Sequence, residues 1–411
     1  MPLAPNIILI GDFCFPSGGG PTSRIRNLAL GFVAQGCRVH ILPLSQRPGT
    51  VPQPQDPAMP PGDAITCVYA PSVLSRQSGA TALPLRNRRF AEKVRWFWRT
   101  YGMRTEMHAR LLDVLTPGAL VIVYGRSYAR LAWIIRAARH RGITVLWDVV
   151  EIVDVFSGFG GRLSPIYWDW QAGSRIFPRL VNGLTVISHA LAQRLQTPVS
   201  RAVLVVPALG AWTGPPRVPA TPDGAFSLLY VGALLAKDAA DLMLDTMREL
   251  AVRGSPVLLK VAGRYAQTQE GQHRAATIQN DPLLRDRVHL LGAPSDAELA
   301  RLMAGADGLL LMRQNAETEI HSFPTRLVEY LQQGLPVFVS AVGDVSLYLR
   351  DGVDAVLLDP QEAGRIADRI EEALMDRAQL PAIGAQGWQR GRECFDRDRH
   401  AAQILAFVAR L

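Results

Sequence analysis

The hydrophobic pattern of this chain alternates between short apolar runs and longer segments in which apolar residues recur every three or four positions. The first run, Asn6–Gly11, is almost wholly apolar, as is typical of a strand buried in a parallel sheet. A glycine-rich turn follows, and the pattern then predicts a helix over Thr22–Gln35 and a second strand over Arg38–Pro43. Together these segments predict a βαβ unit with a right-handed connection.

The same alternation continues along the chain in two blocks. In the first block we expect strands at Leu120–Tyr124, Ile143–Val150 and Leu184–Ile187, and helices at Tyr128–Arg141 and Ala190–Gln196. In the second block we expect strands at Ser227–Val231, Val257–Ala262, Val288–Leu291, Gly308–Met312, Pro336–Ser340 and Val353–Leu358. Its helices are expected at Ala239–Val252, Asp296–Ala304, Leu327–Gln333, Gln361–Met375 and Asp398–Arg410. The aromatic segment Phe156–Trp170 is predicted to be a loop.

This pattern predicts an α/β protein with two Rossmann-like, doubly wound parallel-sheet domains that face a cleft. The expected domains are residues 1–209 and 227–385, joined by a proline- and glycine-rich linker at 210–226. Residues 386–411 should form a helical segment that packs back onto the first domain. Ligands of such sheets bind at the carboxyl ends of the strands, so each domain is expected to hold one of two substrates.

The composition supports a large folded protein. Of the 411 residues, 48% are hydrophobic and 19% are charged, and a chain of this length favours two domains over one core. The formal net charge is +8 and the pI is about 9.6, so phosphorylated substrates, anionic lipid and nucleic acid are all compatible partners. The sequence has no zinc-finger spacing, RNA-binding aromatic motif or basic region with heptads, so we expect no nucleic-acid partner.

The rarer residue types narrow the possibilities further. Four widely spaced cysteines, Cys14, Cys37, Cys67 and Cys394, are expected to be buried thiols in a reducing compartment. The eight histidines make no metal-ligand spacing, so we expect no metal. The first residues do not resemble a signal peptide, and no apolar run is long enough to span a bilayer. We therefore expect a cytoplasmic protein, with attachment to the inner face of the cell membrane left open.

The segment His321–Val339 carries the most specific chemistry. Its first proline suits the start of a helix, where Ser322 or Thr325 can cap the free amides. Such an N-terminus favours a diphosphate, and Arg326 adds a fixed positive charge. Glu329, about one turn into the helix, can accept hydrogen bonds from ribose hydroxyls. The alternative interpretation is an ordinary capped helix with a surface glutamate.

This segment resembles the nucleotide-sugar site of retaining GT-B glycosyltransferases, the large family 4 and its relatives. Glu329 matches the second glutamate of their motif, which that family uses to bind the donor ribose, and His321 occupies the position of the first glutamate. Glu317 and Glu319, just upstream, are alternatives for the missing contact. The resemblance implies a set of donor-binding residues here: Ser322, Phe323, Thr325, Arg326, Leu327 and Glu329.

The start of the second block also resembles that family, whose donor domain opens on a strand, a glycine and a lysine that binds the diphosphate. Gly232 is the glycine, and Ala233 stands where the family has an arginine. Lys237 comes one position early, and Asp238 fills the usual lysine position. Lys237 is therefore either a diphosphate ligand or a solvated lysine at the start of a helix.

Two more glycine loops resemble donor loops of the family. Gly263 ends the next strand, and Arg264 can supply the phosphate charge that Ala233 does not. The loop after the first strand consists of Gly18, Gly19 and Gly20, whose amides would approach donor phosphate or acceptor. Arg24 and Arg26 follow it, to serve an anionic substrate or to lie solvated on a helix.

The strand that ends in Asp148–Glu151 lies where many relatives carry a His-Asp pair. Glu151 takes the position of the aspartate, so the resemblance implies that it binds a sugar hydroxyl. The alternative is a carboxylate that caps the next loop.

Residues Leu85–Arg110 hold eight lysines or arginines against two glutamates, with aromatic residues at helical spacing. This pattern predicts a basic amphipathic helix. Contact with an anionic membrane surface and packing against its own domain are both compatible with it.

The resemblance implies a hexosyltransferase-like enzyme of class EC 2.4. It would move a sugar, with retention, from a nucleotide-diphosphate sugar in the C-terminal domain to a glycan or lipid-linked glycan in the N-terminal domain, as in polysaccharide biosynthesis. It implies catalytic roles for Glu151, His321 and Arg264, and no cofactor besides the nucleotide-sugar substrate. Two alternatives stay open: an epimerase of nucleotide sugars on the same fold, and a donor-binding partner subunit without activity.

Overall fold

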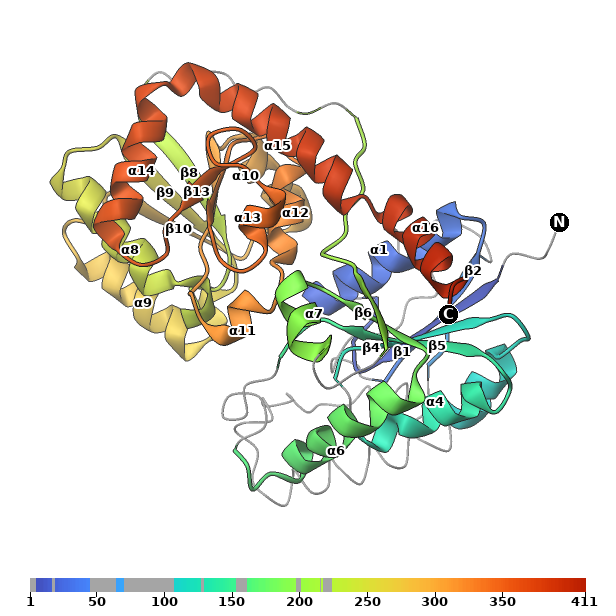
Figure 1. The fold of residues 1–411 in the computed structure, drawn as a ribbon. Helices are drawn as coiled ribbons and strands as arrows, with labels where there is room; N and C mark the ends of the chain where they lie inside the picture. Colours follow the sequence, from blue (N-terminus) through green and yellow to red (C-terminus); the bar gives the residue numbers. More distant parts are fainter. Residues whose placement is uncertain are drawn as a thin grey trace. The chain divides into compact units, whose positions relative to one another are not determined.

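The computed structural model describes residues 5–16, 19–44, 64–69, 107–126, 129–152, 161–196, 201–214, 216 and 224–411. The chain divides into two compact units, each built on its own parallel sheet (Figure 1). Unit 1 comprises Met1–Leu209 and Arg397–Leu411, and unit 2 comprises Gly210–Asp396. Two parallel-sheet α/β units confirm the predicted fold class.

Unit 1 contains a seven-stranded parallel sheet in the order β3-β2-β1-β4-β5-β6-β7. Its strands are β1 Asn6–Gly11, β2 Arg38–Pro43, β3 Ile65–Cys67, β4 Leu120–Tyr124, β5 Thr144–Val149, β6 Gly183–Val186 and β7 Ala202–Val205. Its helices include α1 Gly20–Ala34, η2 Ala129–Leu131, α4 Ala132–Arg139, α6 Pro165–Leu180, α7 His189–Gln196 and α16 Arg397–Val408.

Strand β1 explains why the first apolar run is continuous. Both of its faces are covered: Ile7 and Leu9 belong to the core formed with α1 and α16, whereas Ile8 points to the opposite face and is equally buried. Helices α4 and α6 lie on that opposite side of the sheet (Figure 1). Because adjacent strands are parallel and in register, all their carboxyl ends meet at one edge.

Helix α16, from the end of the chain, packs on α1. A Cβ atom on Gly31 would lie 2.6 Å from the carbonyl oxygen of Arg397, so a glycine is needed for the two helices to approach this closely. Three α16 residues, Ala401, Ile404 and Phe407, are part of the unit 1 core. The last helix therefore completes a core whose other members come from the first half of the chain.

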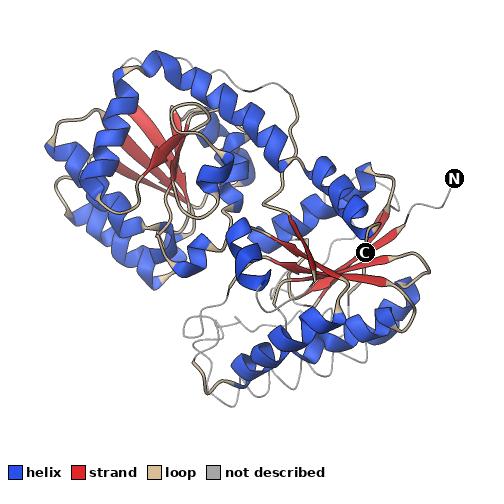
Figure 2. Cartoon of the chain, viewed as in Figure 1, coloured by secondary structure: helices blue, strands red, loops and turns tan. Residues whose placement is uncertain are grey.

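Unit 2 contains a six-stranded parallel sheet in the order β10-β9-β8-β11-β12-β13. Its strands are β8 Phe226–Val231, β9 Val257–Ala262, β10 Val288–Gly292, β11 Gly308–Leu311, β12 Val337–Ser340 and β13 Val356–Leu358. Its helices are η3 Ala236–Asp238, α8 Ala240–Val252, η4 Tyr265–Gln267, α9 Gln269–Asn280, α10 Asp296–Ala304, α11 Glu317–Ile320, α12 Thr325–Leu331, α13 Val345–Tyr348, α14 Ala363–Met375, η5 Arg377–Gln379 and α15 Leu380–Phe395. Helices surround the sheet (Figure 2).

Several expectations about elements were wrong. Phe156–Trp170 is not all loop: α6 begins at Pro165, and residues 153–160 lie outside the described part. Three glycines and a proline favoured a loop over this segment, although Pro165 at a first helical position is favourable to a helix. The segment Tyr128–Arg141 opens as the 3₁₀ turn η2 before α4, and residue 128 is not described.

Helix α15 overlaps the helical segment expected at 386–411, but its first turns, from Leu380, were missed, and its sequence holds glycines that normally weaken a helix. Packing explains them. A Cβ atom on Gly384 would lie 2.4 Å from the carbonyl oxygen of Gly334, and one on Gly387 would lie 2.4 Å from that of Asp354. The glycines let α15 pack directly against backbone, and this contact compensates for low helix propensity.

All four cysteines are free, but only Cys37 is buried, and Cys67 is exposed. The expectation of four buried thiols was therefore wrong. No helix among the described residues is both long and apolar enough to cross a membrane. No group of three or more His, Cys, Asp or Glu side chains in the described ranges is arranged to hold a metal ion.

Candidate functional site

The carboxyl ends of β8 and β9 are brought together by two glycines. Gly232 follows β8 and donates its backbone N–H to the carbonyl of Ala262 at 2.9 Å. Gly263 follows β9 at φ +151°, and a Cβ atom on it would lie 2.0 Å from the carbonyl oxygen of Gly232. Side chains are therefore excluded where the two loops meet. Both glycine amides are already hydrogen-bonded, that of Gly263 to the carbonyl of Gly292 at 2.6 Å, so the glycines serve the close approach of the loops.

The loop after β8 contains two strained residues. Leu234 and Ala239 have φ values of +53° and +47°, a left-handed conformation that costs a non-glycine residue roughly 1–2 kcal/mol. Tyr230 holds the loop, because its hydroxyl donates to Asp238 Oδ2 at 3.0 Å and accepts the Leu234 N–H at 3.3 Å. Burial, and then the neighbouring carboxylate of Asp238, raise the pKa of Tyr230 far above its ordinary value, so the hydroxyl remains a donor.

A buried arginine braces the same loop from outside. Arg274 Nη1 donates to the carbonyl oxygen of Leu234 at 2.8 Å. The rest of the guanidinium makes two 2.7 Å hydrogen bonds to the Asp241 carboxylate. Strained backbone that its surroundings hold in place is typical of functional sites.

Two of the predicted cations lie at these strand ends. Lys237, in η3, is exposed, and its carbonyl accepts the N–H of Gln314 at 3.2 Å. Arg264 is exposed at the start of η4, directly after Gly263. Asp238, which occupies the usual lysine position, instead faces the Tyr230 hydroxyl. The lysine that comes one position early, Lys237, is therefore the charge of this loop that faces solvent.

Helix α12 begins differently from the prediction. Pro324 is its N-cap residue, and no side chain caps it, so the expected cap from Ser322 or Thr325 is wrong. The Ser322 hydroxyl is used elsewhere, donating to the carbonyl of Glu319 at 3.1 Å. The first-turn amides of α12 are thus left without a side-chain acceptor.

Arg326 and Glu329 lie on the solvent side of α12. Arg326 Nη1 donates to Glu329 Oε2 at 2.5 Å, and their side chains are 37% and 38% exposed. Both remain accessible to a ligand. An ion pair this exposed contributes little stability, so exchanging it for ligand contacts costs little.

Phe323 and Leu327, two of the expected donor-binding residues, have buried side chains. The Phe323 ring packs against those of Tyr348 and Phe395, with centroids 5.4 and 5.3 Å away, and Leu327 is fully buried. These residues hold α12 in place. Only their backbone can reach a ligand.

Sequence reasoning missed two residues that position the site. The Tyr330 hydroxyl accepts the N–H of Val231 at 2.8 Å and so fixes α12 to the end of β8. Arg313, after β11, is ion-paired with Glu319 and donates to Ser322 Oγ at 2.8 Å. Burial lowers the pKa of Arg313, opposed by Asp238 and Tyr230. Neither the tyrosine nor the arginine stands out in sequence, because each resembles its many solvated counterparts.

The Arg313 pairing bears on the position where the motif lacks its first glutamate. The carboxylate of Glu319 is committed to Arg313, which leaves it poorly placed to replace that glutamate. His321 ends α11, and its Nδ1 lies 2.7 Å from the carbonyl oxygen of Glu317. Its ring is partly exposed beside the uncapped start of α12.

In unit 1, the glycine loop precedes α1. Gly18 lies outside the described residues. Gly19 is the N-cap residue of α1, and Gly20 is its first residue. A Cβ atom on Gly19 would meet nothing within 4 Å in the part of the chain that the structure describes, so no contact there requires a glycine.

Arg24 does not serve a substrate, because it is buried. Its Nε and Nη2 donate to the Asp148 carboxylate at 2.8 and 2.7 Å, and its other hydrogen bonds go to the carbonyls of Val206 and Pro207. Thr185 also donates to Asp148, at 2.8 Å. This network fixes α1 to the carboxyl ends of the strands.

Of the two carboxylates at the end of β5, only Glu151 is exposed. It makes an ion pair of 3.1 Å with Arg126. Most of the basic segment Leu85–Arg110 lies outside the described residues, and only residues 107–110 are seen, as part of a helix.

Residues 216–389 match the family described as glycosyl transferases group 1. D-inositol 3-phosphate glycosyltransferase of Geodermatophilus obscurus is 29% identical to this chain, over 35% of this chain and 40% of that relative. The match thus spans less than half of the relative's length.

The whole chain is also similar in fold to solved structures. Sucrose-phosphate synthase from Thermosynechococcus elongatus has a TM-score of 0.70 at 17% identity, covering 99% of this chain and 98% of that one. HepE from Anabaena, in complex with UDP, has a TM-score of 0.65 at 14% identity, covering 99% and 100%. At such identities the similarity shows the fold alone.

Proposed function

We propose that this protein transfers a sugar from a nucleotide-diphosphate sugar to an acceptor, because residues 216–389 match the glycosyl transferases group 1 family and the two units have the GT-B fold. One observation carries the proposal: the close contact of Gly232 and Gly263 at the carboxyl edge of the unit 2 sheet. It brings together the loops after β8 and β9, each of which carries an exposed cation, Lys237 and Arg264, that would face a diphosphate. HepE, of the same fold, binds UDP, so uridine nucleotides are the first donors to test.

The residues around the carboxyl edge of the unit 2 sheet suit the diphosphate, the ribose and the sugar of such a donor. Lys237, Arg264 and Arg326 would neutralise the diphosphate as it leaves, together with the uncapped amides of α12. Glu329 would give up its exposed ion pair with Arg326 and accept hydrogen bonds from the ribose hydroxyls instead. Ser322 and Thr325 flank the start of α12 and would line the diphosphate site, while His321 would face the sugar.

The reaction would proceed with retention, as in family 4. The protein's contribution would be to position two substrates and to stabilise a leaving diphosphate, and no enzyme nucleophile is needed. Unit 1 would hold the acceptor, with Gly18, Gly19 and Gly20 approaching a substrate and Glu151 binding a sugar hydroxyl. No cofactor would be required besides the nucleotide sugar.

The acceptor would be a glycan or a lipid-linked glycan of a polysaccharide pathway. The basic segment Leu85–Arg110 supports the lipid-linked form, since eight cationic residues can attach a protein reversibly to an anionic membrane. Two other functions remain compatible with the fold: an epimerase, which releases free product, and a donor-binding partner subunit.

The first experiment measures turnover of a panel of nucleotide sugars with and without glycan acceptors. A glycosyltransferase transfers the sugar only when an acceptor is present. Product release without an acceptor would indicate an epimerase, and stabilisation by a donor without turnover would indicate a binding subunit.

A variant series then tests the site. Arg264→Ala with Arg326→Ala should depress turnover more than it weakens binding of the bare nucleoside, because both charges would act on the leaving diphosphate. Arg285→Ala with Arg301→Ala is the matched control, since it removes two exposed arginines of the same unit. Equal activity of the two double variants would contradict the assignment.

A further inference from the structure

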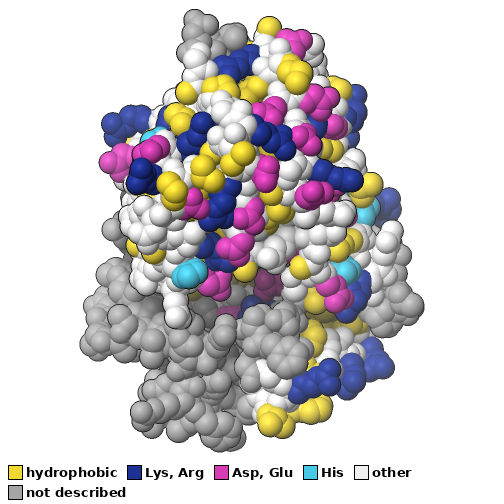
Figure 3. Space-filling model, turned by 90° about the vertical axis from the view of Figure 1, so that its left-hand side faces the viewer, with side chains coloured by type: hydrophobic (Ala, Val, Ile, Leu, Met, Phe, Trp, Pro, Cys, Tyr) yellow, Lys and Arg dark blue, Asp and Glu magenta, His cyan; other side chains and the backbone are white. Residues whose placement is uncertain are grey.

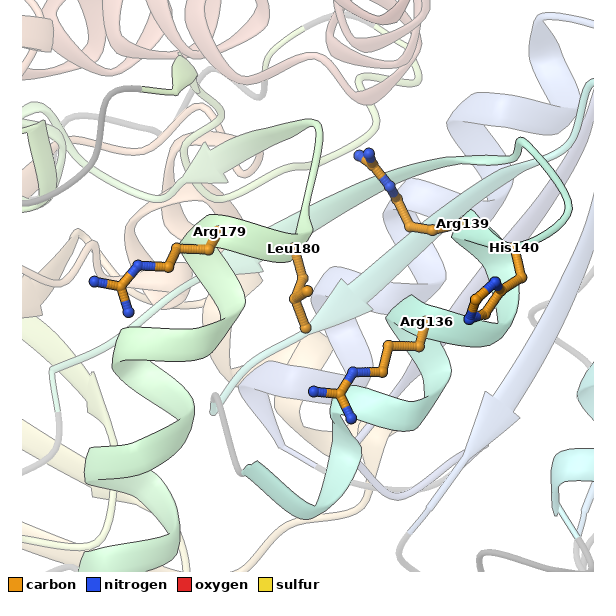
Figure 4. A pocket seen from close by; sticks show the side chains of 5 residues that line it. All are labelled: Arg136, Arg139, His140, Arg179 and Leu180. Carbon is orange, nitrogen blue, oxygen red and sulfur yellow. The ribbon is translucent and has the colours of Figure 1, made fainter.

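A pocket in unit 1 is lined almost entirely by cations. Its volume is about 190 Å³, and its walls are formed by Arg136, Arg139, His140, Arg179 and Leu180. Figure 4 shows that the side chains come from two segments, the end of α4 and the end of α6. Three arginines and a histidine thus surround one aliphatic residue, and their guanidinium groups point in different directions.

Among the residues that the structure describes, these three arginines have no acidic partner, unlike several arginines of unit 2. In unit 2, lysines and arginines are interspersed with carboxylates over the surface (Figure 3), and Arg248, Arg253 and Arg369 each pair with more than one acid. In the described part of unit 1, no ion pair involves Arg136, Arg139 or Arg179. Three like charges around one pocket repel each other, and an anion would relieve that repulsion.

The helix ends do not cancel this charge. The carboxyl terminus of a helix carries roughly half a negative charge, so two of them contribute about one. Arg179 and its neighbour Arg201 use part of their hydrogen bonding on helix carbonyls, those of Arg175 and Arg179. Three full positive charges against about one negative charge leave the pocket cationic, and guanidinium geometry matches phosphate oxygens.

The position of the pocket separates it from the proposed reaction. Arg139 and His140 lie just before β5 begins at Thr144, and Leu180 lies just before β6 begins at Gly183. The pocket is therefore at the amino-terminal edge of the unit 1 sheet, whereas Glu151 follows the carboxyl end of β5. We propose that this pocket binds a phosphate group that is not part of the donor.

Such a phosphate could belong to a lipid headgroup or to a soluble phosphorylated molecule. One experiment compares both, using the full chain with Arg264→Ala and Arg326→Ala to remove phosphate binding at the donor site. The first arm measures flotation with phosphatidylcholine vesicles that contain or lack phosphatidylglycerol. The second arm measures calorimetric binding of inorganic phosphate.

Arg136→Glu with Arg179→Glu should weaken binding in one arm or the other by about tenfold or more, since two attractive charges become repulsive. Arg136→Gln with Arg179→Gln should have a smaller effect in the same direction. The control is Arg38→Glu with Arg410→Glu, which changes the net charge of unit 1 equally at exposed positions outside the pocket.

A loss confined to vesicles identifies a lipid headgroup, and a loss confined to inorganic phosphate identifies a soluble ligand. Either supports the pocket. Equal binding by the parent and the pocket variants in both arms would overturn it. So would an equal loss in the Arg38 and Arg410 control, because the effect would then follow from net charge alone.

Discussion

Two arginines of α1 that are two positions apart lie in different surroundings. Arg24 is buried with its Nε and Nη2 on Asp148, whereas Arg26 is only partly buried and donates to the carbonyl of Pro16 at 2.8 Å. A similar contrast separates Arg313, partly buried and paired with Glu319, from the exposed Arg264. Charge type alone therefore does not identify the substrate-binding arginines; burial and available partners do.

The buried pair of Arg24 and Asp148 should be important for folding of unit 1. Arg24→Met leaves the Asp148 carboxylate buried with Thr185 as its remaining side-chain donor, and breaking a buried pair on one side costs about 3–5 kcal/mol. Hydrogen exchange of β1 and β5 peptides should reveal this loss. Arg24→Met with Asp148→Leu should be milder, because no charge is left unpaired. If Arg24→Met alone protected β1 and β5 from hydrogen exchange as well as the parent does, the buried pair would not be important for folding of unit 1.

Glu329 tests the donor site at the level of one side chain. Glu329→Ala should weaken nucleotide-sugar binding by ~1.5–3 kcal/mol, the range for a hydrogen bond to a charged group. Calorimetric titration of the donor measures it. Glu371→Ala serves as a control, being another partly exposed, arginine-paired glutamate of unit 2. Unchanged donor affinity in a folded Glu329→Ala protein would exclude the ribose contact.

At the scale of elements, the loop after β8 depends on neighbours from other elements. Its left-handed Leu234 is held by Tyr230 from β8 and by Arg274 from α9, and the carbonyl of Lys237 is hydrogen-bonded to Gln314 in the loop after β11. Helix α12 is held in turn to the end of β8, because its Tyr330 hydroxyl accepts the N–H of Val231. The site is thus built by contacts among strand ends, and a change in one loop should affect the others.

Asp241 gives this bracing a pH dependence. The hydrogen bonds from Arg274 lower the pKa of Asp241, so its carboxylate stabilises the folded state above the ordinary aspartate pKa of about 4. That stability is lost as the pH falls through the lowered value. Asp241→Asn should therefore destabilise unit 2 at neutral pH by roughly 0.5–1 kcal/mol, a modest amount because the carboxylate is well exposed.

Thermal unfolding of the parent and Asp241→Asn over a pH series measures this effect. The difference between them should shrink as the pH drops below about 4. Asp286→Asn, at an exposed pair with a neighbouring residue, should show no such trend. A difference that stays constant down to low pH would mean that the charge of Asp241 is not the cause.

At the scale of the molecule, each unit closes its core with a distant part of the chain. Unit 1 recruits Ala401, Ile404 and Phe407 from α16, and each of the two larger side chains contributes about 1.5–3 kcal/mol on burial. In unit 2 the corresponding helix is α15, whose Gly384 and Gly387 approach the backbone of the segments before β12 and β13. The two units therefore share one continuous C-terminal segment, divided between Asp396 and Arg397.

Removal of α16 should separate the stabilities of the two units. A chain that ends at Asp396 should lose protection in β1 and β4 peptides, while unit 2 keeps its protection, because only the unit 1 core loses members. Hydrogen exchange followed by mass spectrometry measures the protection of both units in one sample. Removal of Arg410 and Leu411 alone should have a much smaller effect. Equal protection of unit 1 with and without α16 would show that its core does not need the helix.

The sequence by itself determined the two parallel sheets, because strands buried on both faces must be almost continuously apolar, and Asn6–Gly11 and Leu120–Tyr124 show this directly. It also located the segment around Glu329, since its chemistry is local. Tertiary structure alone decided the rest. Arg24 is buried because Asp148 lies beside it across the fold, and α15 forms because neighbouring backbone leaves room only for glycine. Such contacts join residues far apart in the chain, so no local pattern could record them.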